Sequence, residues 1–295
     1  MYLKDTDKIS RGSCINTHLS ISKLVCLSLL GSLFYSCLSH PMEENTRFGK
    51  RIIGGQSVTD DSYGFMGILK INKLSDGWFL CGATLINNST LITAAHCVST
   101  PKYNIPTKQL IIGLGSPNIA KQIEVKPLKV TIHPQWSFST LENDIAVIKI
   151  PPIKISKKIW PINLATYGIA QDTNVVALGW GKLSNNDDNL SENLQKVGLV
   201  TGNPELCSAL KPNKKRNSKS LLCTINSKSL RKDTCLGDSG GPLITDNGNS
   251  GKQFIGITSF GTNSTGFGNN ECGLKSGYGF YTKVSYYFDF IYNSL

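Results

Sequence analysis

Short apolar runs recur about every ten residues from residue 64 to residue 261, and they constrain the fold more than any other feature of the chain. Gly, Pro, Asn and Ser separate these runs, which read GFMGILKI, FLCGATLI, LITAA, QLIIGLG, DIAVIKI, VVALGWG, QKVGLV and FIGITSFG. Many short strands at this spacing predict an all-β sandwich or barrel. The last segment, VSYYFDFIYNSL, carries its aromatic and apolar residues at helical spacing and predicts a C-terminal helix.

The N-terminal segment predicts export. Residues 24–38 form a short apolar run, LVCLSLLGSLFYSCL, and basic residues precede it, which is the pattern of a signal peptide. We therefore expect residues 1–39 to be a signal peptide, cleaved beside a small residue such as Ser36 or Ser39, and the mature protein to be secreted. The run is shorter than the ~20 apolar residues of a membrane span. The polar stretch before it is long, so a membrane anchor remains the alternative.

The cysteines indicate disulfides rather than a metal site. Nine are present, and three of them precede residue 40. The other six are Cys81, Cys97, Cys207, Cys223, Cys235 and Cys272. An even, spread-out set without a C-x-x-C pair is typical of disulfides in an exported chain, with fifteen connectivities open. Sequons for N-glycosylation, also consistent with export, begin at Asn87, Asn88, Asn189 and Asn263.

The charge balance of the chain is basic. A formal net charge of +11 can indicate a nucleic-acid partner. No zinc-finger spacing and no basic helix supports that interpretation, so we expect no nucleic-acid binding. A basic exosite for an anionic partner is a further hypothesis, carried by Lys211, Lys214, Lys215 and Arg216, but a solvated loop is the preferred interpretation.

Three separate motifs carry the residue types of nucleophilic catalysis. His96 lies in LITAAHC, where a cystine at the next residue would restrain a general base. Asp144 leads the apolar run DIAVIKI, the half-buried position that a carboxylate needs in order to orient a histidine. Ser239 lies in GDSGGP, whose glycines allow a tight turn and expose the serine side chain. Each residue alone would be assigned a structural role, whereas the three together favour catalysis.

The serine motif also satisfies G-x-S-x-G, the nucleophile elbow of α/β-hydrolases. Those enzymes place the acid and the histidine after the serine, and here no histidine follows Ser239. The apolar runs also do not alternate with helical segments. We therefore set the α/β-hydrolase fold aside.

TAAHC, DIAV and GDSGGP, in this order, resemble the trypsin and chymotrypsin family of serine proteases, and the resemblance covers residues 52–295. It implies an all-β fold of two six-stranded antiparallel β-barrels with a C-terminal helix and the catalytic cleft between the barrels. It further implies a monomeric endopeptidase that works without a cofactor or a metal ion.

The resemblance assigns a role to each catalytic position. Ser239 resembles the nucleophile, and His96 resembles the general base and then the general acid. Asp144 resembles the residue that orients the imidazole and stabilises its cation. The backbone amides of Gly237 and Ser239 resemble the oxyanion hole, and Ser259 resembles the serine that hydrogen-bonds the buried aspartate. The disulfide pairs that the resemblance implies are Cys81–Cys97, Cys207–Cys223 and Cys235–Cys272.

The sequence RIIGG resembles the activation site of the family. Cleavage after Arg51 would free the amine of Ile52, whose ammonium group would pair with Asp238 and order the oxyanion loop. Residues 40–51 would then be a short propeptide, and residues 52–295 the protease domain. Lys50 before Arg51 also admits a convertase that cuts after paired basic residues as the activating protease.

Asp233 lies six residues before Ser239 and resembles the base of the primary specificity pocket. A carboxylate there selects Arg or Lys side chains of substrates. Gly261 and Gly279 resemble the two wall positions that must be small. We therefore expect peptide bonds to be cut after Arg or Lys, and protein protease inhibitors to be partners as well as protein substrates.

The chain departs from the usual family pattern at a few positions. Phe260 stands where the family usually has Trp, and residues 262–271 form a longer connection at the pocket rim. Tyr278 stands where digestive trypsins tend to carry Pro, and a Tyr there goes with sodium sensitivity. The calcium loop of the family would fall near residues 113–125, whose only acid is Glu124, so no calcium is expected. A non-catalytic homologue that only binds partners is the competing hypothesis, and the intact catalytic residues speak against it.

Overall fold

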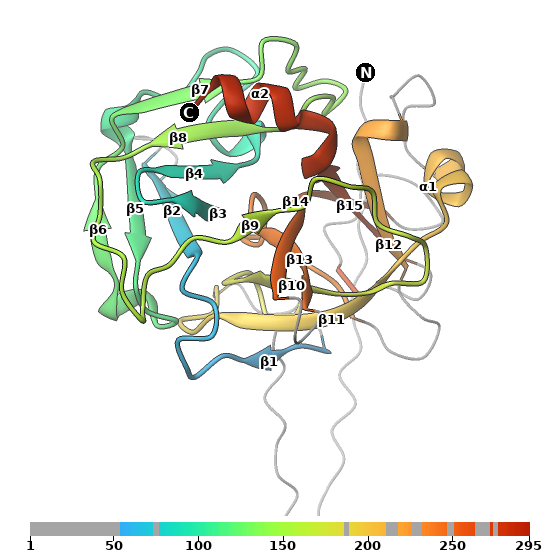
Figure 1. The fold of residues 1–295 in the computed structure, drawn as a ribbon, viewed down its shortest axis with the longest axis horizontal. Helices are drawn as coiled ribbons and strands as arrows, with labels where there is room; N and C mark the ends of the chain where they lie inside the picture. Colours follow the sequence, from blue (N-terminus) through green and yellow to red (C-terminus); the bar gives the residue numbers. More distant parts are fainter. Residues whose placement is uncertain are drawn as a thin grey trace, which may run out of the picture. The chain divides into compact units, whose positions relative to one another are not determined.

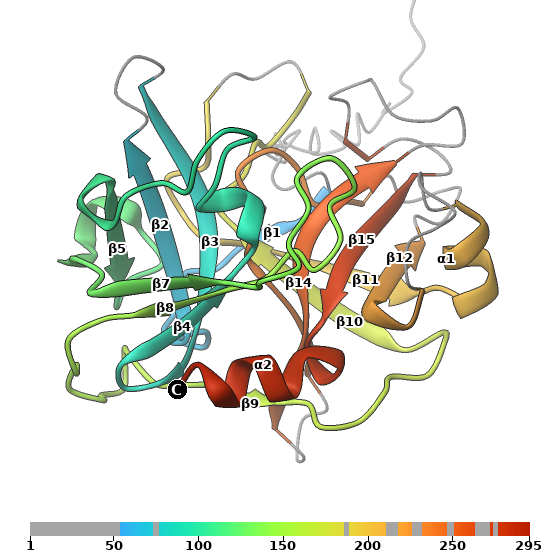
Figure 2. The same ribbon diagram turned by 90° about the horizontal axis from the view of Figure 1, so that it is seen from above.

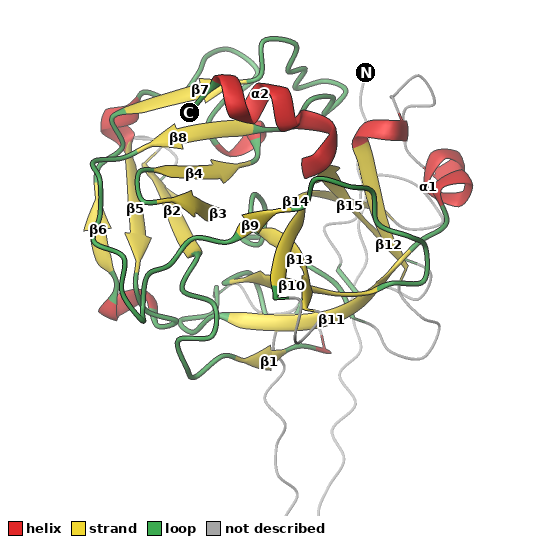
Figure 3. Ribbon diagram, viewed as in Figure 1, coloured by secondary structure: helices red, strands yellow, loops and turns green. Residues whose placement is uncertain are grey.

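Strands make up most of the regular structure in the computed structural model (Figure 3). The structure describes residues 54–72, 77–185, 189–210, 218–225, 232–246, 251–262, 272–273 and 277–295. These residues all belong to one compact unit, Phe48–Leu295. Each of the eight apolar runs named above contributes to a strand, which confirms the all-β prediction.

The first sheet has seven antiparallel strands and curls around the larger part of the core. In spatial order its strands are β6 (Ile123–Val125), β5 (Leu110–Leu114), β2 (Met66–Asn72), β3 (Trp78–Asn87), β4 (Thr90–Thr93), β8 (Ala146–Lys149) and β7 (Lys129–Ile132). β4 and most of β2 are buried on both faces, as the interior of a curled sheet requires.

The second sheet closes into a barrel of six strands, with two further short strands attached to it. In spatial order its strands are β1 (Gln56–Ser57), β11 (Gln195–Thr201), β10 (Asn174–Gly179), β13 (Pro242–Asp246), β14 (Lys252–Thr262), β15 (Tyr278–Lys283) and β12 (Leu221–Ile225), and β9 (Asn163–Leu164) pairs parallel with β14. Pairing of β11 with β12 closes the barrel. Along β11, residues 195, 197, 199 and 201 are buried and alternate with more exposed ones, the period-2 pattern of a barrel wall.

The two-barrel prediction is confirmed, with a difference in how each barrel is built. The second sheet is a closed six-stranded barrel, whereas the first is a curled seven-stranded sheet that forms a half-barrel. Figures 1 and 2 both show β2 to β8 on one side of the unit and β10 to β15 on the other.

The first strand and the last helix of the described residues tie the two sheets together. β1, which precedes the first sheet in sequence, pairs with β11 of the second. The C-terminal helix α2 (Phe288–Asn293) continues a 3₁₀ turn and returns to the first sheet (Figure 1). There the rings of Tyr287 and Phe290 pack on His133, at centroid distances of 5.3 Å and 4.8 Å. The predicted C-terminal helix is therefore confirmed.

One further helix, α1 (Pro204–Leu210), precedes β12. Among the described residues, no helix has the length and apolar character needed to cross a bilayer.

Candidate active site

His96 is fixed where the first sheet meets the second. β4 ends at Thr93, and the chain turns through a 3₁₀ segment, Ala95–Cys97, whose other two residues are buried. A disulfide joins Cys97 to Cys81 of β3. The side chain of His96 is 20% exposed, so its backbone is held while its ring still faces the surface.

Asp144 is a buried carboxylate whose charge is met by hydrogen bonds. Its Oδ1 accepts the backbone N–H of His96 at 2.9 Å, and its Oδ2 lies 2.8 Å from Nδ1 of the same residue. Ser259 donates its hydroxyl to Oδ2 at 2.5 Å. A hydrogen bond from the Thr282 hydroxyl, at 2.9 Å, holds the backbone carbonyl of Asp144. Such bonds offset the cost of removing a carboxylate from water.

This arrangement selects one tautomer of His96. Because Nδ1 faces a carboxylate, Nδ1 carries the proton and Nε2 is left to accept one. A histidine in this state is prepared to act as a general base.

Ser239 belongs to a segment that is bonded to both sheets. Its backbone carbonyl accepts the N–H of Gly82 in β3 at 2.7 Å. The next amide, that of Gly240, donates to Thr258 in β14 at 2.8 Å. Gly240 has φ +76°, and a Cβ there would lie 2.6 Å from the Gly82 carbonyl oxygen and against the Thr93 side chain. The backbone of Ser239 is therefore held beside the strand end that leads into His96.

The turn before Ser239 also requires glycine. Gly237 has φ +98°, a conformation that L side chains rarely adopt. A Cβ at this position would lie 2.9 Å from the Cα of Gly181 and 2.8 Å from the Leu190 side chain. The N–H of Asp238 closes the turn by donating to the carbonyl of Cys235 at 2.9 Å.

The carboxylate of Asp238 is fully buried behind this turn. Its Oδ2 accepts the backbone N–H of Cys235, and its Oδ1 accepts that of Gly181, both at 2.8 Å. Burial raises the pKa of Asp238 to about 7, and the negative charge of Asp233 adds to the rise, while the two N–H donors oppose it. A cation brought to this carboxylate would favour its ionised form.

Asp233 is a buried carboxylate. Its Oδ2 accepts the N–H of Gly273 at 3.2 Å. Gly261 of β14 and Gly279 of β15 are cross-strand neighbours. A Cβ on Gly279 would lie 2.9 Å from the hydroxyl oxygen of Thr224, so that position has no room for a side chain.

The residue that replaces the usual Trp of the family is held by an aromatic stack. The Phe260 ring lies on that of Phe280, with centroids 4.7 Å apart and an interplanar angle of 7°. The structure forms three disulfides in the described residues, Cys81–Cys97, Cys207–Cys223 and Cys235–Cys272, the same pairs that the resemblance implies.

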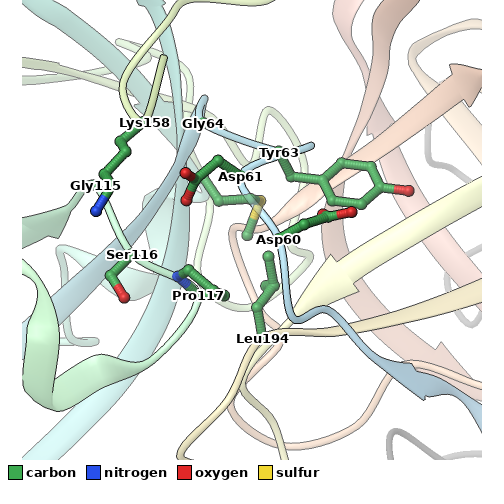
Figure 4. A pocket seen from close by; sticks show the side chains of 10 residues that line it. Asp60, Asp61, Tyr63, Gly64, Gly115, Ser116, Pro117, Lys158 and Leu194 are labelled. Atoms are coloured by element: carbon green, nitrogen blue, oxygen red, sulfur yellow. The ribbon is translucent and has the colours of Figure 1, made fainter. Parts of the chain in front are cut away.

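A small pocket lies apart from all of these residues. Figure 4 shows its lining, which includes Asp60, Asp61 and Lys158. Its volume of 10 Å³ is at the lower limit for one water molecule. In the neighbouring stretch where the family calcium loop would fall, Glu124 forms an ion pair with Lys70 at 2.7 Å. Neither feature contains a residue of the predicted site.

Several predicted features lie outside the described residues. They are the leader and propeptide with Arg51 and Ile52, residues 263–271 of the longer connection, the sequon at Asn263, and the basic residues Lys211, Lys214, Lys215 and Arg216.

The structure adds site residues that sequence reasoning missed. Thr282 bonds the carbonyl of Asp144, and nothing in its sequence context indicates this. Asn143 has φ +56° and accepts the hydroxyl of Tyr287 at 3.0 Å. The residue type could have indicated this backbone conformation, because Asn tolerates the left-handed region better than most residues.

Comparisons with known proteins agree with this geometry. A family model described as Trypsin matches residues 52–291. Serine protease 1 of Rattus norvegicus is 29% identical over 280 residues, which cover 93% of this chain and 99% of that protein. Transmembrane protease serine 11C of Mus musculus is 31% identical over 250 residues, 82% of this chain and 53% of that protein. Vitamin K-dependent protein C of Oryctolagus cuniculus is 32% identical over 231 residues, 73% of this chain and 46% of that protein.

The chain thus spans about half the length of two of these relatives and nearly all of the first. The family model covers most of the chain and includes His96, Asp144 and Ser239. On these grounds the chain belongs to the trypsin family of serine proteases.

Proposed function

We propose that the protein is a secreted endopeptidase that cuts proteins after Arg or Lys and is made as an inactive precursor. The observation that supports the specificity is the burial of the Asp233 carboxylate, two residues before the disulfide-bonded Cys235. The observation that supports catalysis is the Asp144–His96 pair next to the segment of Ser239.

In the proposed reaction, the hydroxyl oxygen of Ser239 attacks the carbonyl carbon of the scissile bond. His96 Nε2 takes the hydroxyl proton and returns it to the nitrogen of the leaving amine. The negative charge on the substrate oxygen is met by the amides of Gly237 and Ser239. A water molecule, activated by the same histidine, then releases the acyl group from Ser239. Asp144 stabilises the imidazolium ion that forms in both steps.

The proposed specificity follows from the cost of a buried charge. A substrate Arg or Lys brings a cation to Asp233 and replaces its own hydration with a charge-assisted hydrogen bond. A neutral side chain would cover the carboxylate without meeting its charge, which costs several kcal/mol. Gly261, where a Cβ would meet only the Tyr278 carbonyl oxygen at 3.7 Å, leaves room for the long aliphatic stem of the basic side chain.

The proposed activation uses Asp238. Cleavage after Arg51 would create the ammonium group of Ile52, and this cation would pair with the buried carboxylate. Asp238 also accepts the N–H of Cys235, in the turn before Ser239, and that of Gly181 after β10, so the ion pair would order the oxyanion hole. An activating protease is therefore an expected partner.

We further propose that the mature chain is secreted as a monomer, carries N-linked glycans and is controlled by protein protease inhibitors. Cell fractionation tests the export route. Recovery of intact protein in membranes that resist salt and carbonate washing would favour the anchored alternative.

The specificity is tested on the activated enzyme with matched Arg, Lys, Phe and Leu substrates. We expect kcat/KM for Arg and Lys to exceed that for Phe by at least about 10³, since each 1.4 kcal/mol is tenfold. Asp233→Ser should remove the preference, whereas Asp61→Ser, which changes an exposed carboxylate of the small pocket, should keep it. Equal cleavage after Phe and Arg by the wild type would contradict the proposal. A wild type that binds partners but cleaves none of the substrates would favour the non-catalytic homologue.

A further inference from the structure

The side chain of Asn185 forms two hydrogen bonds with the backbone of one distant residue. Its Oδ1 accepts the N–H of Cys272 at 2.8 Å, and its Nδ2 donates to the carbonyl of the same residue at 3.0 Å. The two residues are 87 positions apart in the sequence. A primary amide carries an acceptor oxygen and an NH₂ donor group in one plane, so it can bind a peptide unit as a neighbouring strand would.

Cys272 connects Asn185 to the proposed specificity pocket. Its disulfide partner, Cys235, lies two residues after Asp233. The residue after it, Gly273, donates its N–H to Asp233 Oδ2 at 3.2 Å. Movement of Cys272 would therefore displace a hydrogen-bond donor from the carboxylate at the base of the pocket.

The same short segment is also held at its other end. Gly181, four residues before Asn185, donates its N–H to Asp238 Oδ1 at 2.8 Å. Asp238 in turn accepts the N–H of Cys235. Residues 181–185 therefore connect the buried Asp238 carboxylate to Cys272, which the disulfide joins to Cys235.

We propose that Asn185 is a positioning residue for the specificity pocket, which it stabilises by holding Cys272 and, through it, the Gly273 amide that binds Asp233. This inference rests on the proposed function, because it assumes that Asp233 receives a basic side chain. Asn185 itself is exposed and touches no reacting atom, so its effect is on substrate binding and not on the chemical step.

The first experiment measures the affinity of the activated enzyme for benzamidine, a small aromatic amidine that probes a pocket with a carboxylate at its base. Asn185→Ala removes both hydrogen bonds, each of modest net strength. We expect the inhibition constant to rise about five- to thirtyfold and KM for an Arg substrate to rise in parallel, with kcat within about twofold of the wild type. The matched control is Asn193→Ala, another exposed asparagine whose side chain accepts the Asn118 amide at 3.0 Å, away from the pocket.

The second experiment follows hydrogen exchange in the full chain carrying Ser239→Ala, which prevents self-digestion. Added Asn185→Ala should speed exchange in the peptide that contains Cys272 and Gly273, whereas Asn193→Ala should leave it unchanged. A general loss of stability would accelerate exchange throughout the chain, so an effect confined to this peptide separates positioning from a structural role.

The outcomes distinguish a failure of the role proposed for Asn185 from a failure of the proposed specificity for Arg and Lys. Wild type that binds benzamidine and cuts after Arg, together with an Asn185→Ala variant of equal affinity and equal KM, would overturn this inference alone. A fall in kcat without a change in benzamidine affinity would overturn it as well. Wild type that neither binds benzamidine nor cuts after Arg would overturn the proposed specificity and this inference with it.

Discussion

Asp144 accepts two hydrogen bonds from the same residue, His96, one from its backbone N–H at Oδ1 and one from its ring at Oδ2. The first bond fixes where the residue stands, and the second fixes which ring nitrogen carries the proton. A single carboxylate therefore controls both the position and the tautomer of the proposed general base.

Asp144→Asn should separate these two effects. The amide keeps the size of the side chain but places a donor where Nδ1–H must be accepted, so the opposite tautomer is favoured. We expect kcat to fall by about 10⁴, the size that this substitution has in the trypsin family. Steady-state kinetics with an Arg substrate measures the loss, and the melting temperature checks that the variant is folded. A folded variant within tenfold of wild-type kcat would show that the tautomer is set by something else.

Ser239→Ala tests the nucleophile. The hydroxyl is the only group of this side chain that the proposed reaction uses, so the variant should fold with an unchanged melting temperature and lose amidase activity. Retention of more than about a hundredth of wild-type turnover would contradict the assignment, since removal of a catalytic nucleophile normally costs far more. Ser62→Ala, at an exposed serine in the β1–β2 connection, serves as the control and should remain fully active.

Arg51→Gln tests the activation step. This variant can no longer be cut between residues 51 and 52, so it should stay nearly inert after treatment with trypsin, whereas the wild-type precursor should gain activity. N-terminal sequencing of the active form should begin Ile-Ile-Gly-Gly. Full activity of the intact Arg51→Gln chain would show that the turn before Ser239 is ordered without a new ammonium group.

The raised pKa of Asp238 predicts how the stability of the precursor depends on pH. With a pKa of about 7 in the folded state and about 4 in the unfolded chain, the folded precursor keeps a proton that the unfolded chain loses between these values. The contribution of Asp238 to the free energy of unfolding should therefore be highest below about pH 4 and fall by roughly 4 kcal/mol in all as pH rises to about 7. Above about pH 7 this contribution should be constant.

Urea unfolding of the precursor with Ser239→Ala, at pH 5 and pH 8, measures this dependence. Adding Asp238→Asn should flatten it, because the titrating group is gone. Cleavage after Arg51 should flatten it too, since the ammonium group of Ile52 would keep the carboxylate ionised at both pH values. An identical pH dependence in the precursor with and without Asp238→Asn would contradict the prediction.

The strands and the order of the catalytic motifs could be predicted because both are local signals. Apolar runs such as DIAVIKI are complete within one strand, and TAAHC and GDSGGP are each contiguous. The difference between a closed barrel and a curled half-barrel could not be predicted. It depends on whether the two edge strands of a sheet pair with each other, and such pairing leaves no sequence pattern within either strand. Helix α1 is too short for its periodicity to stand out. A capping signal was nevertheless present, because Asn203 accepts the N–H of Glu205 at 2.7 Å and Pro204 opens the helix.

The contact of Asn185 with Cys272 shows the limit of sequence reasoning within the site. A side-chain amide that binds a backbone unit 87 residues away has no characteristic spacing and no required neighbour. By contrast, Gly237 could be predicted from its motif, because the turn demands a conformation that other residues rarely adopt.

The bond between the amide of Gly82 and the carbonyl of Ser239 has a consequence for biosynthesis. Ser239 lies 157 residues after Gly82 of β3, so a nascent chain that already contains every strand of the first sheet still lacks the proposed nucleophile. Unfinished chains on the ribosome, and fragments that end before residue 239, are therefore expected to be inactive as proteases. If Ser239 is the nucleophile, the order of synthesis protects the producing cell even before the proposed propeptide does.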